Sequence, residues 1–210
     1  MKGVGRVNDP AKLQSKALAS GDVVSRADPR WVRLRRQIEE HALQLGDFTL
    51  ASGRKSSFIF QLRQTTLHPE GAHLLADVIV DYMAGQGIGC IGGLALGAVP
   101  IVSAVAAISA VKNAPVDAFF VRKEVKAHGA KERIDGFVRD DRELLLVDDV
   151  ATTGGSILKA LEGLREEGKN CVARKALVII DRQEGATENL AEHGIELVSI
   201  FKKSDFNVEG

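Results

Sequence analysis

Apolar residues recur along the chain with two alternating periods, one typical of a helix and one typical of a buried strand. Residues 29–45 show the helical period, because Trp31, Leu34 and Ile38 follow it with charged residues between them, and Gly46 is expected to end this helix. The predicted helices cover residues 29–45, 69–83, 97–111, 155–167 and 187–192, and the predicted strands cover residues 48–50, 58–62, 88–92, 116–121, 143–147, 172–180 and 195–200.

The alternation of strands and helices predicts the fold class. Strands separated by helices form βαβ units, in which parallel strands make a sheet that helices cover on both faces. We therefore expect an α/β protein with a central, mainly parallel sheet flanked by helices, and with a small N-terminal helix and hairpin as a hood. Ligands of such sheets bind outside the carboxyl ends of the strands. The candidate loops are those after Gly92, Val121, Val147 and Ile180.

The regular pattern begins at Pro29, which divides the chain into two unequal parts. A chain of 210 residues suits one large domain, and we expect that domain to span residues 29–210. Residues 1–28 lack the apolar core of a secretion signal and are expected to be a poorly ordered extension. No apolar run is long enough to cross a membrane, so no membrane partner is expected.

Charge and cysteine content limit the expected partners and the expected location of the protein. The 28 basic and 28 acidic residues give a formal net charge of zero, so nucleic acid is not an expected partner and any anion site must be local. Cys90 and Cys171 cannot form a disulfide scaffold, and neither has a nearby second cysteine for zinc. A reducing compartment, the cytoplasm, is the expected location.

The segment VDDVATTGGS, residues 147–156, combines the features of a site for a phosphorylated sugar. It follows an apolar strand and precedes a helix, whose first N–H groups and positive dipole end suit a phosphate. Gly154 and Gly155 let the backbone come close to that anion. The adjacent carboxylates of Asp148 and Asp149 can accept hydrogen bonds from vicinal sugar hydroxyls and tolerate a divalent cation nearby.

A capped helix, with the aspartates as turn formers, is the purely structural explanation of the same segment. Two adjacent acids followed by Thr-Thr-Gly-Gly exceed what capping requires. A Walker loop is excluded, because the glycines are not followed by lysine and then serine or threonine. The segment therefore predicts a phosphate loop with a place for sugar hydroxyls.

Two further loops follow predicted strands. Residues 93–100 contain Gly97, which would let the backbone approach a diphosphate, although a plain turn explains this stretch nearly as well. Residues 122–136 carry five basic residues and one histidine. Such a run is normally a solvated surface loop. At the carboxyl end of a strand, however, it can neutralise a departing diphosphate and exclude water.

Two of these segments resemble known sequences. Residues 147–156 closely resemble the diphosphate-ribose signature of the type I phosphoribosyltransferases, which use 5-phosphoribosyl 1-diphosphate with magnesium. The pattern RKE-x-K-x-H-G at residues 122–129 closely resembles the catalytic loop of the orotate phosphoribosyltransferases. The resemblance implies the type I phosphoribosyltransferase fold. It also implies transfer of the phosphoribosyl group to orotate, which gives orotidine 5′-phosphate and diphosphate in pyrimidine biosynthesis.

The resemblance assigns roles by matching position. It implies that Lys126, His128 and Asp149 are catalytic, and that Thr152 and Arg182 bind orotate, since a guanidinium makes a two-pronged contact with a carboxylate. The residues implied to hold 5-phosphoribosyl 1-diphosphate are Arg122, Lys123, Lys126, His128, Asp148, Asp149, Val150, Ala151, Thr152, Thr153, Gly154, Gly155 and Ser156. Magnesium is expected to be held mainly through the diphosphate and not directly by protein side chains. A homodimer is implied, because the family's catalytic loop reaches into the neighbouring subunit.

Two positions depart from the family, and two other functions remain open. Many relatives carry lysine where this chain has Ala51, and some carry lysine where it has Gly97, so those contacts are not expected here. One alternative is a purine or uracil phosphoribosyltransferase, against which Arg182 and the basic insert argue. The other is a transcriptional regulator that senses the sugar phosphate without chemistry. Residues 1–28 are too short for the helix-turn-helix that such a regulator would need.

Overall fold

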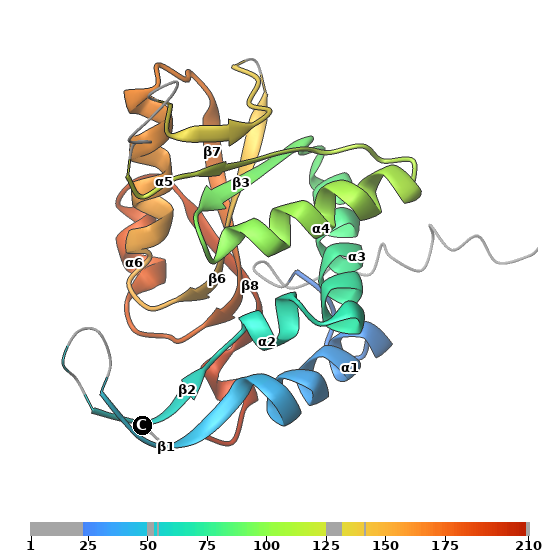
Figure 1. Ribbon diagram of the computed structural model, residues 1–210, viewed down its shortest axis with the longest axis vertical. Coiled ribbons are helices and arrows are strands. Elements are labelled where there is room, and N and C mark those ends of the chain that lie inside the picture. The colour runs from blue at the N-terminus through green and yellow to red at the C-terminus, as the bar shows by residue number, and fades with distance from the viewer. Residues whose placement is uncertain (1–22, 50–52, 54, 125–131, 141, 209–210) are drawn as a thin grey trace, which may run out of the picture.

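A computed structural model describes residues 23–49, 53, 55–124, 132–140 and 142–208 (Figure 1). Within these ranges the main sheet has six strands in the order β5-β4-β3-β6-β7-β8. Its strands are β3 (Cys90–Leu94), β4 (Asp117–Val121), β5 (Ile134–Gly136), β6 (Glu143–Ala151), β7 (Val172–Asp181) and β8 (Glu196–Lys202). All neighbours pair in parallel except β5, which is antiparallel to β4. The predicted α/β fold with a mainly parallel sheet is confirmed.

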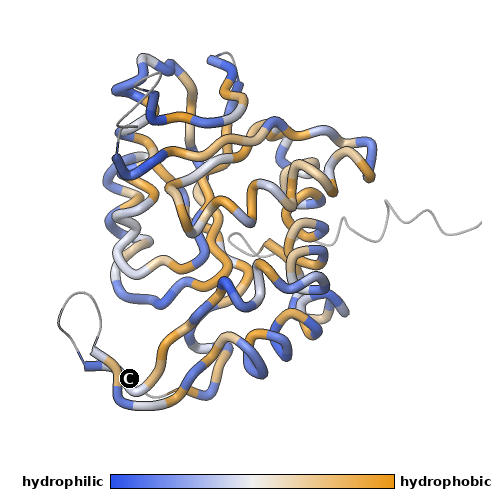
Figure 2. The backbone as a smooth tube through the Cα atoms, in the orientation of Figure 1, coloured by the Kyte–Doolittle hydropathy of each residue, from blue (hydrophilic) through white to orange (hydrophobic). Residues whose placement is uncertain are grey.

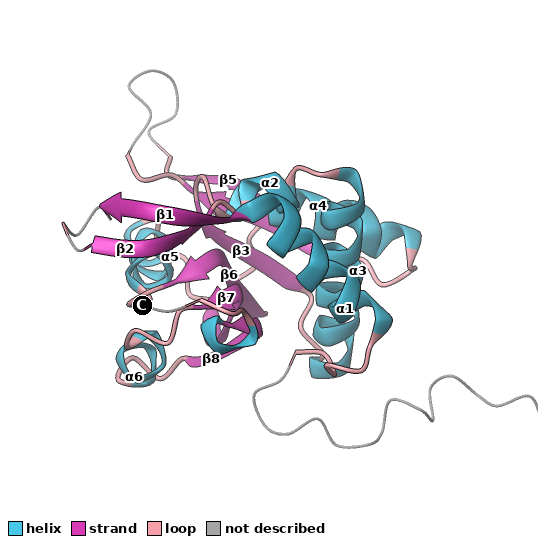
Figure 3. Cartoon of the chain, turned by 90° about the horizontal axis from the view of Figure 1, so that it is seen from below, coloured by secondary structure: helices cyan, strands magenta, loops and turns pink. Residues whose placement is uncertain are grey.

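Helices cover both faces of this sheet, and the view in Figure 3 separates them clearly. One face carries α3 (Pro69–Gln86) and α4 (Ala98–Val111), and the other carries α5 (Gly155–Glu166) and α6 (Ala186–Ala191). The packing of strand β6 shows why its residues 144–147 are all apolar. Leu145 and Val147 belong to the first core, whereas Leu144 and Leu146 belong to the second. A strand buried on both faces needs apolar residues at successive positions.

The N-terminal part forms the expected hood. It consists of α1 (Pro29–Gln37), a π-helical turn (Ile38–Ala42), the antiparallel hairpin of β1 (Leu43–Thr49) and β2 (Lys55–Phe60), and the short helix α2 (Arg63–Thr66). The hairpin lies beside the carboxyl edge of the sheet, below it in Figure 1. The hood thereby covers the edge at which ligands of parallel sheets bind.

The predicted helix at residues 29–45 is wrong in its last three residues. Trp31, Leu34 and Ile38 are buried as expected, but Leu45 is 71% exposed. The chain leaves the helix at Leu43, which pairs with Phe60 on β2. Pairing with a distant strand outweighs the local helical period here. Gly46 accordingly lies inside β1 and does not end a helix.

The packed part of the chain begins before the predicted boundary at residue 28. Val23 and Val24 are buried and belong to the same core as Trp31. Asp28 caps α1, since its carboxylate accepts a 2.8 Å hydrogen bond from the backbone N–H of Arg30. Residues 23–28 are therefore part of the domain, and residues 1–22 lie outside the described residues.

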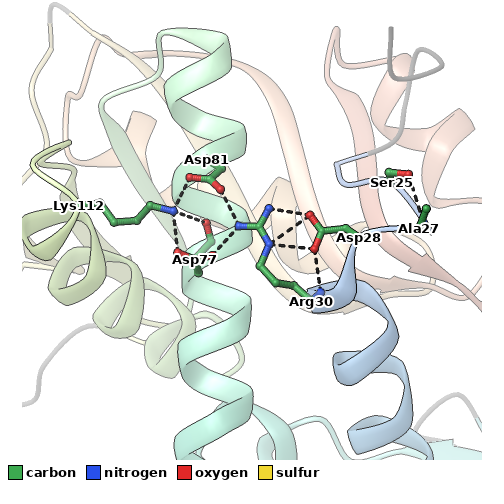
Figure 4. Close-up of polar contacts among 7 residues, drawn as sticks. All are labelled: Ser25, Ala27, Asp28, Arg30, Asp77, Asp81 and Lys112. Atoms are coloured by element: carbon green, nitrogen blue, oxygen red, sulfur yellow. Dashed lines mark hydrogen bonds and ion pairs between the residues drawn. The ribbon is translucent and has the colours of Figure 1, made fainter. Parts of the chain in front are cut away.

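A network of charged side chains ties the hood to the sheet domain (Figure 4). Arg30 lies between three carboxylates, because its guanidinium binds Asp28 at 2.8 Å, Asp77 at 2.5 Å and Asp81 at 2.6 Å. Lys112, just beyond α4, binds Asp77 at 2.6 Å and also contacts Asp81. The network joins the first turn of α1 to the middle of α3 and the end of α4.

We expect Arg30→Met to lower the free energy of unfolding by about 2–3 kcal/mol at pH 7, because Asp77 and Asp81 would be left with Lys112 and Asp28 would lose its bond to Arg30. The hydrogen bond from Arg30 lowers the pKa of Asp28 below its ordinary 3.8. This stabilisation is therefore present above about pH 4 and is lost as the pH falls through the lowered value. Urea unfolding at pH 7 and pH 3 measures both effects. Arg33→Met, at an exposed pair, is the control, and an equal loss in both variants would contradict a special role for the network.

Candidate active site

A cleft of about 460 Å³ opens at the carboxyl ends of β3 and β6, between the sheet and the hood. Its position agrees with the loops that the sequence marked as candidates. The residues that line it are Phe60, Gln61, Leu62, Arg63, Leu94, Ala95, Leu96, Gly97, Lys123, Asp148, Asp149, Val150 and Ser156. Five of the residues expected to hold 5-phosphoribosyl 1-diphosphate thus line one space: Lys123, Asp148, Asp149, Val150 and Ser156.

Asp148 and Asp149 lie at the end of β6, which continues to Ala151 instead of ending at residue 147 as predicted. Asp148 is only 8% exposed. The backbone N–H of Asp149 donates a 3.0 Å hydrogen bond to Oδ1 of Asp148, and the hydroxyl of Ser156 hydrogen-bonds the same carboxylate. Burial, together with the neighbouring charge of Asp149, raises the pKa of Asp148 to about 7. The cleft therefore concentrates negative charge where a cation or hydroxyl groups would relieve it.

Asp148→Asn is expected to stabilise the ligand-free protein. Because the folded-state pKa of Asp148 is raised from 3.8 to about 7, ionisation of this group opposes folding increasingly from about pH 4 to pH 7 and by a constant amount above that. The variant should gain roughly 2–4 kcal/mol at pH 8 and little near pH 4. Chemical unfolding measured between about pH 4 and pH 8 tests this prediction, with Glu162→Gln on the exposed face of α5 as the control. A gain that does not depend on pH would contradict this origin.

The expected phosphate loop turns directly into α5. Gly154 has a left-handed backbone, with φ of 76°, and the helix begins at Gly155. A Cβ on Gly154 would lie 2.8 Å from Leu190, so glycine is required for packing as well as for conformation. The side chain of Asn189 donates a 2.6 Å hydrogen bond to the carbonyl of Thr153. Helix α6 therefore supports the loop from outside the cleft, a role that its sequence did not indicate.

The loop at residues 94–97 lies directly against the acidic pair. A Cβ on Gly97 would lie 2.5 Å from Oδ1 of Asp148 and 2.9 Å from Oδ1 of Asp149. A side chain at this position would have to displace the carboxylates, so the glycine does more than complete a plain turn. The peptide bond between Ala95 and Leu96 is cis. This loop forms the wall of the cleft opposite the phosphate loop.

The basic insert contributes one described side chain to the cleft. Lys123 lines the cleft, whereas the guanidinium of Arg122 pairs with Asp135 on β5 and lies 5.5 Å from the Phe120 ring centroid. Arg122 was expected to bind the sugar diphosphate, but in this structure its guanidinium is paired with Asp135 at the edge of the sheet. Lys126 and His128 lie outside the described residues, so their predicted roles stay predictions.

Arg182, expected to bind a carboxylate, follows β7 and is 8% exposed. Its Nε donates to Oε1 of Glu184 at 2.8 Å, and its Cζ lies 5.0 Å from the ring centroid of Phe58 on β2. The intervening Gln183 has a left-handed φ of 58°, which brings residues 182 and 184 together. The backbone N–H of Arg182 donates to the carbonyl of Ala151 at 2.9 Å. The guanidinium is therefore held rigidly between the strand end and the hood, although it is not among the residues that line the cleft.

Three polar residues near the site were not predicted. Gln61 and Arg63 line the cleft from the hood, and Glu184 holds Arg182. The sequence places Gln61 near the end of the predicted strand at residues 58–62 and Arg63 just after it, but nothing in their spacing distinguishes them from ordinary surface residues. Glu184 lies in the segment that carried Arg182, so its acidic charge two residues away was a usable signal.

The described residues also bear on metal binding and on membrane insertion. In the described ranges, no three His, Cys, Asp or Glu side chains gather in a way that would hold a metal ion. The two carboxylates of the cleft leave room for a cation held partly by a ligand. None of the described helices is long and apolar enough to cross a membrane.

Comparison with known proteins defines the class. Residues 63–203 match the family model for the phosphoribosyl transferase domain. The crystal structure of Mycobacterium tuberculosis orotate phosphoribosyltransferase in complex with Fe(III) dicitrate matches 86% of this chain and all of that chain, with a TM-score of 0.73 and 30% identity. The structure of that enzyme with 5-phospho-α-D-ribosyl 1-diphosphate has a TM-score of 0.69 and 28% identity, over 84% and 98% of the two chains. The fold and the cleft are thus those of a type I phosphoribosyltransferase.

The curated relatives identify the family within this class. The orotate phosphoribosyltransferase of Rhodopseudomonas palustris (strain BisB5) is 46% identical over 178 residues, which cover 83% of this chain and 94% of the relative. That of Rhodopirellula baltica is 36% identical over 82% of this chain and 91% of its own length. The chain belongs to the orotate phosphoribosyltransferase family, as the sequence resemblance indicated.

Proposed function

We propose that the cleft at the end of β6 is where this chain transfers the phosphoribosyl group of 5-phosphoribosyl 1-diphosphate to orotate. The observation that carries the assignment is the acidic pair of buried Asp148 and half-buried Asp149, which lies next to the helix that follows the phosphate loop and against the close-packed loop at Gly97. Sugar hydroxyls satisfy the carboxylates, and the first N–H groups of α5 receive the 5-phosphate. Thr152 and Thr153 add hydroxyl donors to the phosphate.

Orotate is proposed to lie on the hood side of the cleft. Glu184 engages the Nε edge of Arg182, and the terminal amino groups of the same guanidinium provide the fork that matches a planar carboxylate. The guanidinium of Arg182 also lies over the ring of Phe58, 5.0 Å from its centroid, and this contact helps to hold the fork in place. Thr152 contacts the base from the phosphate loop, as the family resemblance implies. Uracil lacks the carboxylate, so the arrangement favours orotate.

Magnesium fits this site without a dedicated set of protein ligands. Burial and the neighbouring charge of Asp149 raise the pKa of Asp148, so a cation near this pair would relieve their repulsion. They would hold it through the ribose hydroxyls while the diphosphate supplies most of its ligands. When bound, magnesium supplies charge neutralisation for the diphosphate leaving group.

The reaction is proposed to proceed by displacement at the anomeric carbon. The ring nitrogen of orotate forms the new bond to this carbon and releases its proton to solvent, as the carbon–oxygen bond to diphosphate breaks and diphosphate leaves with the electron pair. Asp149 positions the ribose, and Lys123 stabilises the developing negative charge together with Lys126 and His128. No protein nucleophile takes part.

Base specificity tests the proposal directly. Wild-type protein is mixed with magnesium, 5-phosphoribosyl 1-diphosphate and one of four bases: orotate, uracil, hypoxanthine or adenine. We expect turnover of orotate and negligible turnover of the others. Turnover of another base instead of orotate would assign the chain to a purine or uracil enzyme, and binding of the sugar diphosphate without any turnover would indicate a sensor protein.

A homodimer that shares its catalytic loop is the proposed assembly. Helix α4 has 14 residues and no charged side chain, and Figure 2 shows few hydrophilic positions along it. Leu96 before the helix is 66% exposed and Val111 at its end is 77% exposed. An apolar helix with exposed apolar ends favours a partner surface. The proposed location is the cytoplasm, where both cysteines would remain free.

Mixing two inactive variants tests the shared site. Lys126→Ala and Asp149→Ala are each expected to turn over slowly, because each removes a different part of the same site. Mixed dimers should regain one working site, formed by Asp149 of one subunit and Lys126 of the other. Activity that stays at the level of the separate variants after subunit exchange would indicate self-contained subunits.

A further inference from the structure

Among the described basic residues of the insert, Arg133 has the most buried side chain, which is 15% exposed and makes several polar contacts. Its Nη1 binds Oε2 of Glu166, and its backbone N–H donates to Oε1 of Glu167 at 2.9 Å. Its Nε and Nη2 both donate to the carbonyl of Arg122, each at 3.3 Å. One side chain therefore connects the two stems of the insert to the last turn of α5.

The contacts at Arg122 determine the position of the next residue. The N–H of Arg122 donates to the carbonyl of Arg133 at 2.7 Å, and its own carbonyl accepts from the Arg133 guanidinium. Arg133 thus holds both backbone polar groups of Arg122. That carbonyl belongs to the peptide plane that joins Arg122 to Lys123, the described basic residue of the insert that lines the cleft.

The packing of α5 supports the same connection. A Cβ on Gly163 would clash with Val121 at 2.5 Å and would lie in ordinary contact with the Arg133 guanidinium carbon at 3.5 Å, so the glycine lets α5 pack closely against β4 at the place where Arg133 lies. The first residues of α5, Gly155 and Ser156, form the end of the phosphate loop. One rigid helix therefore carries the phosphate loop at its N-terminus and the anchor of Arg133 at its C-terminus.

We propose that Arg133 is a positioning residue that fixes Lys123 relative to the phosphate loop, by clamping the Arg122–Lys123 peptide to the C-terminal turn of α5. The inference rests on the proposed role of Lys123 toward the diphosphate. A purely structural ion pair with Glu166, which is 51% exposed, would need no bonds to the Arg122 carbonyl and would contribute little to stability. A displacement of about 1 Å in a charge-stabilising group is sufficient to slow a reaction greatly.

The test combines Arg133→Met with Lys123→Ala. Alone, Arg133→Met is expected to lower kcat/KM for 5-phosphoribosyl 1-diphosphate about 10-fold or more, with KM for orotate within about twofold of wild type. Lys123→Ala is expected to lower it about 100-fold. In the double variant Arg133→Met should add no further loss, because it acts through Lys123. Arg133→Lys, which retains charge but not the paired donors, should recover part of the activity.

Arg139→Met is the matched control. Arg139 is another arginine, which pairs with Asp117 at the start of β4, and its loss should leave kcat/KM unchanged. Glu166→Gln is the second variant in case Arg133→Met folds poorly, and several-fold slower turnover is expected. Additive losses in the double variant, or a wild-type rate for Arg133→Met, would overturn the inference alone. A wild-type rate for Lys123→Ala would overturn it together with the role of Lys123, whereas absent orotate turnover in wild type would overturn the proposed function.

Discussion

Asp149→Asn is expected to lower kcat/KM for 5-phosphoribosyl 1-diphosphate by about 10³-fold while the protein stays folded. The carboxylate is proposed to accept hydrogen bonds from the ribose hydroxyls, and each charged hydrogen bond contributes about 1.5–3 kcal/mol. An amide keeps the shape of the side chain but removes the charge and half of its acceptors. Steady-state kinetics and calorimetric titration with the sugar diphosphate and magnesium measure the loss.

A second consequence separates this effect from misfolding. The charge of Asp149 contributes to the raised pKa of Asp148, so Asp149→Asn should bring that pKa down toward 3.8, which carboxyl NMR signals would report. Glu143→Gln, at the opposite end of β6, is the matched control and should leave kinetics unchanged. Tight binding of the sugar diphosphate by Asp149→Asn would contradict the assigned role of the acidic pair.

Arg182→Met is expected to lower kcat/KM for orotate by about 10²–10³-fold with little change in affinity for the sugar diphosphate. The substitution keeps the length of the side chain and its contact with Phe58 but leaves the orotate carboxylate without a cation, which costs about 3–4 kcal/mol for a two-pronged contact. Arg182→Lys restores charge without the planar fork, so it should recover only part of the loss. Kinetics with each substrate varied in turn separate the two effects.

The matched control for this prediction is Arg174→Met, near the start of β7. Arg174 lies on the strand that ends just before Arg182 and pairs with Glu143 at the opposite edge of the sheet. Its loss should not alter kcat/KM for either substrate. A fall in affinity for the sugar diphosphate that matches the fall for orotate would show that Arg182 supports the cleft generally and does not select the base.

The sequence predicted the sheet domain well because its strands are buried on both faces. The run of four apolar residues at 144–147 has no other good explanation, and the structure divides them between two cores. Predicted and observed ends of α5 differ by one residue at most. Helix α3 likewise begins at Pro69 and runs to Gln86, where Gly87 caps it with a left-handed backbone.

The hood and the insert were predicted less well, because distant contacts decide their structure. Leu43 pairs with Phe60, and this pairing ends a helix that local periodicity would have continued. Strand β5 has only three residues, and it exists because Val121 and Phe120 on β4 offer partners to Ile134 and Asp135. Neither pairing leaves a periodic trace in the sequence.

The candidate site shows the same contrast between features that the local sequence determines and features that contacts with distant residues determine. Asp148, Asp149 and Ser156 face one cleft, as the motif at the end of a strand predicted, because the backbone itself places them there. Arg63 was missed because it comes from the distant hood, whereas Glu184 was missed although it lies only two residues from Arg182. Arg122 was expected in the site but pairs with Asp135, which only the hairpin of β4 and β5 brings near.

The identity and amount of product test the central claim most directly. Wild-type protein is incubated with orotate, 5-phosphoribosyl 1-diphosphate and magnesium, and the products are identified by mass spectrometry beside a sample of Asp149→Asn at equal concentration. We expect orotidine 5′-phosphate and diphosphate in equal amounts from the wild type and far less of both from the variant. Diphosphate released without the nucleotide, or equal product from both proteins, would contradict transfer to orotate at the acidic pair of β6.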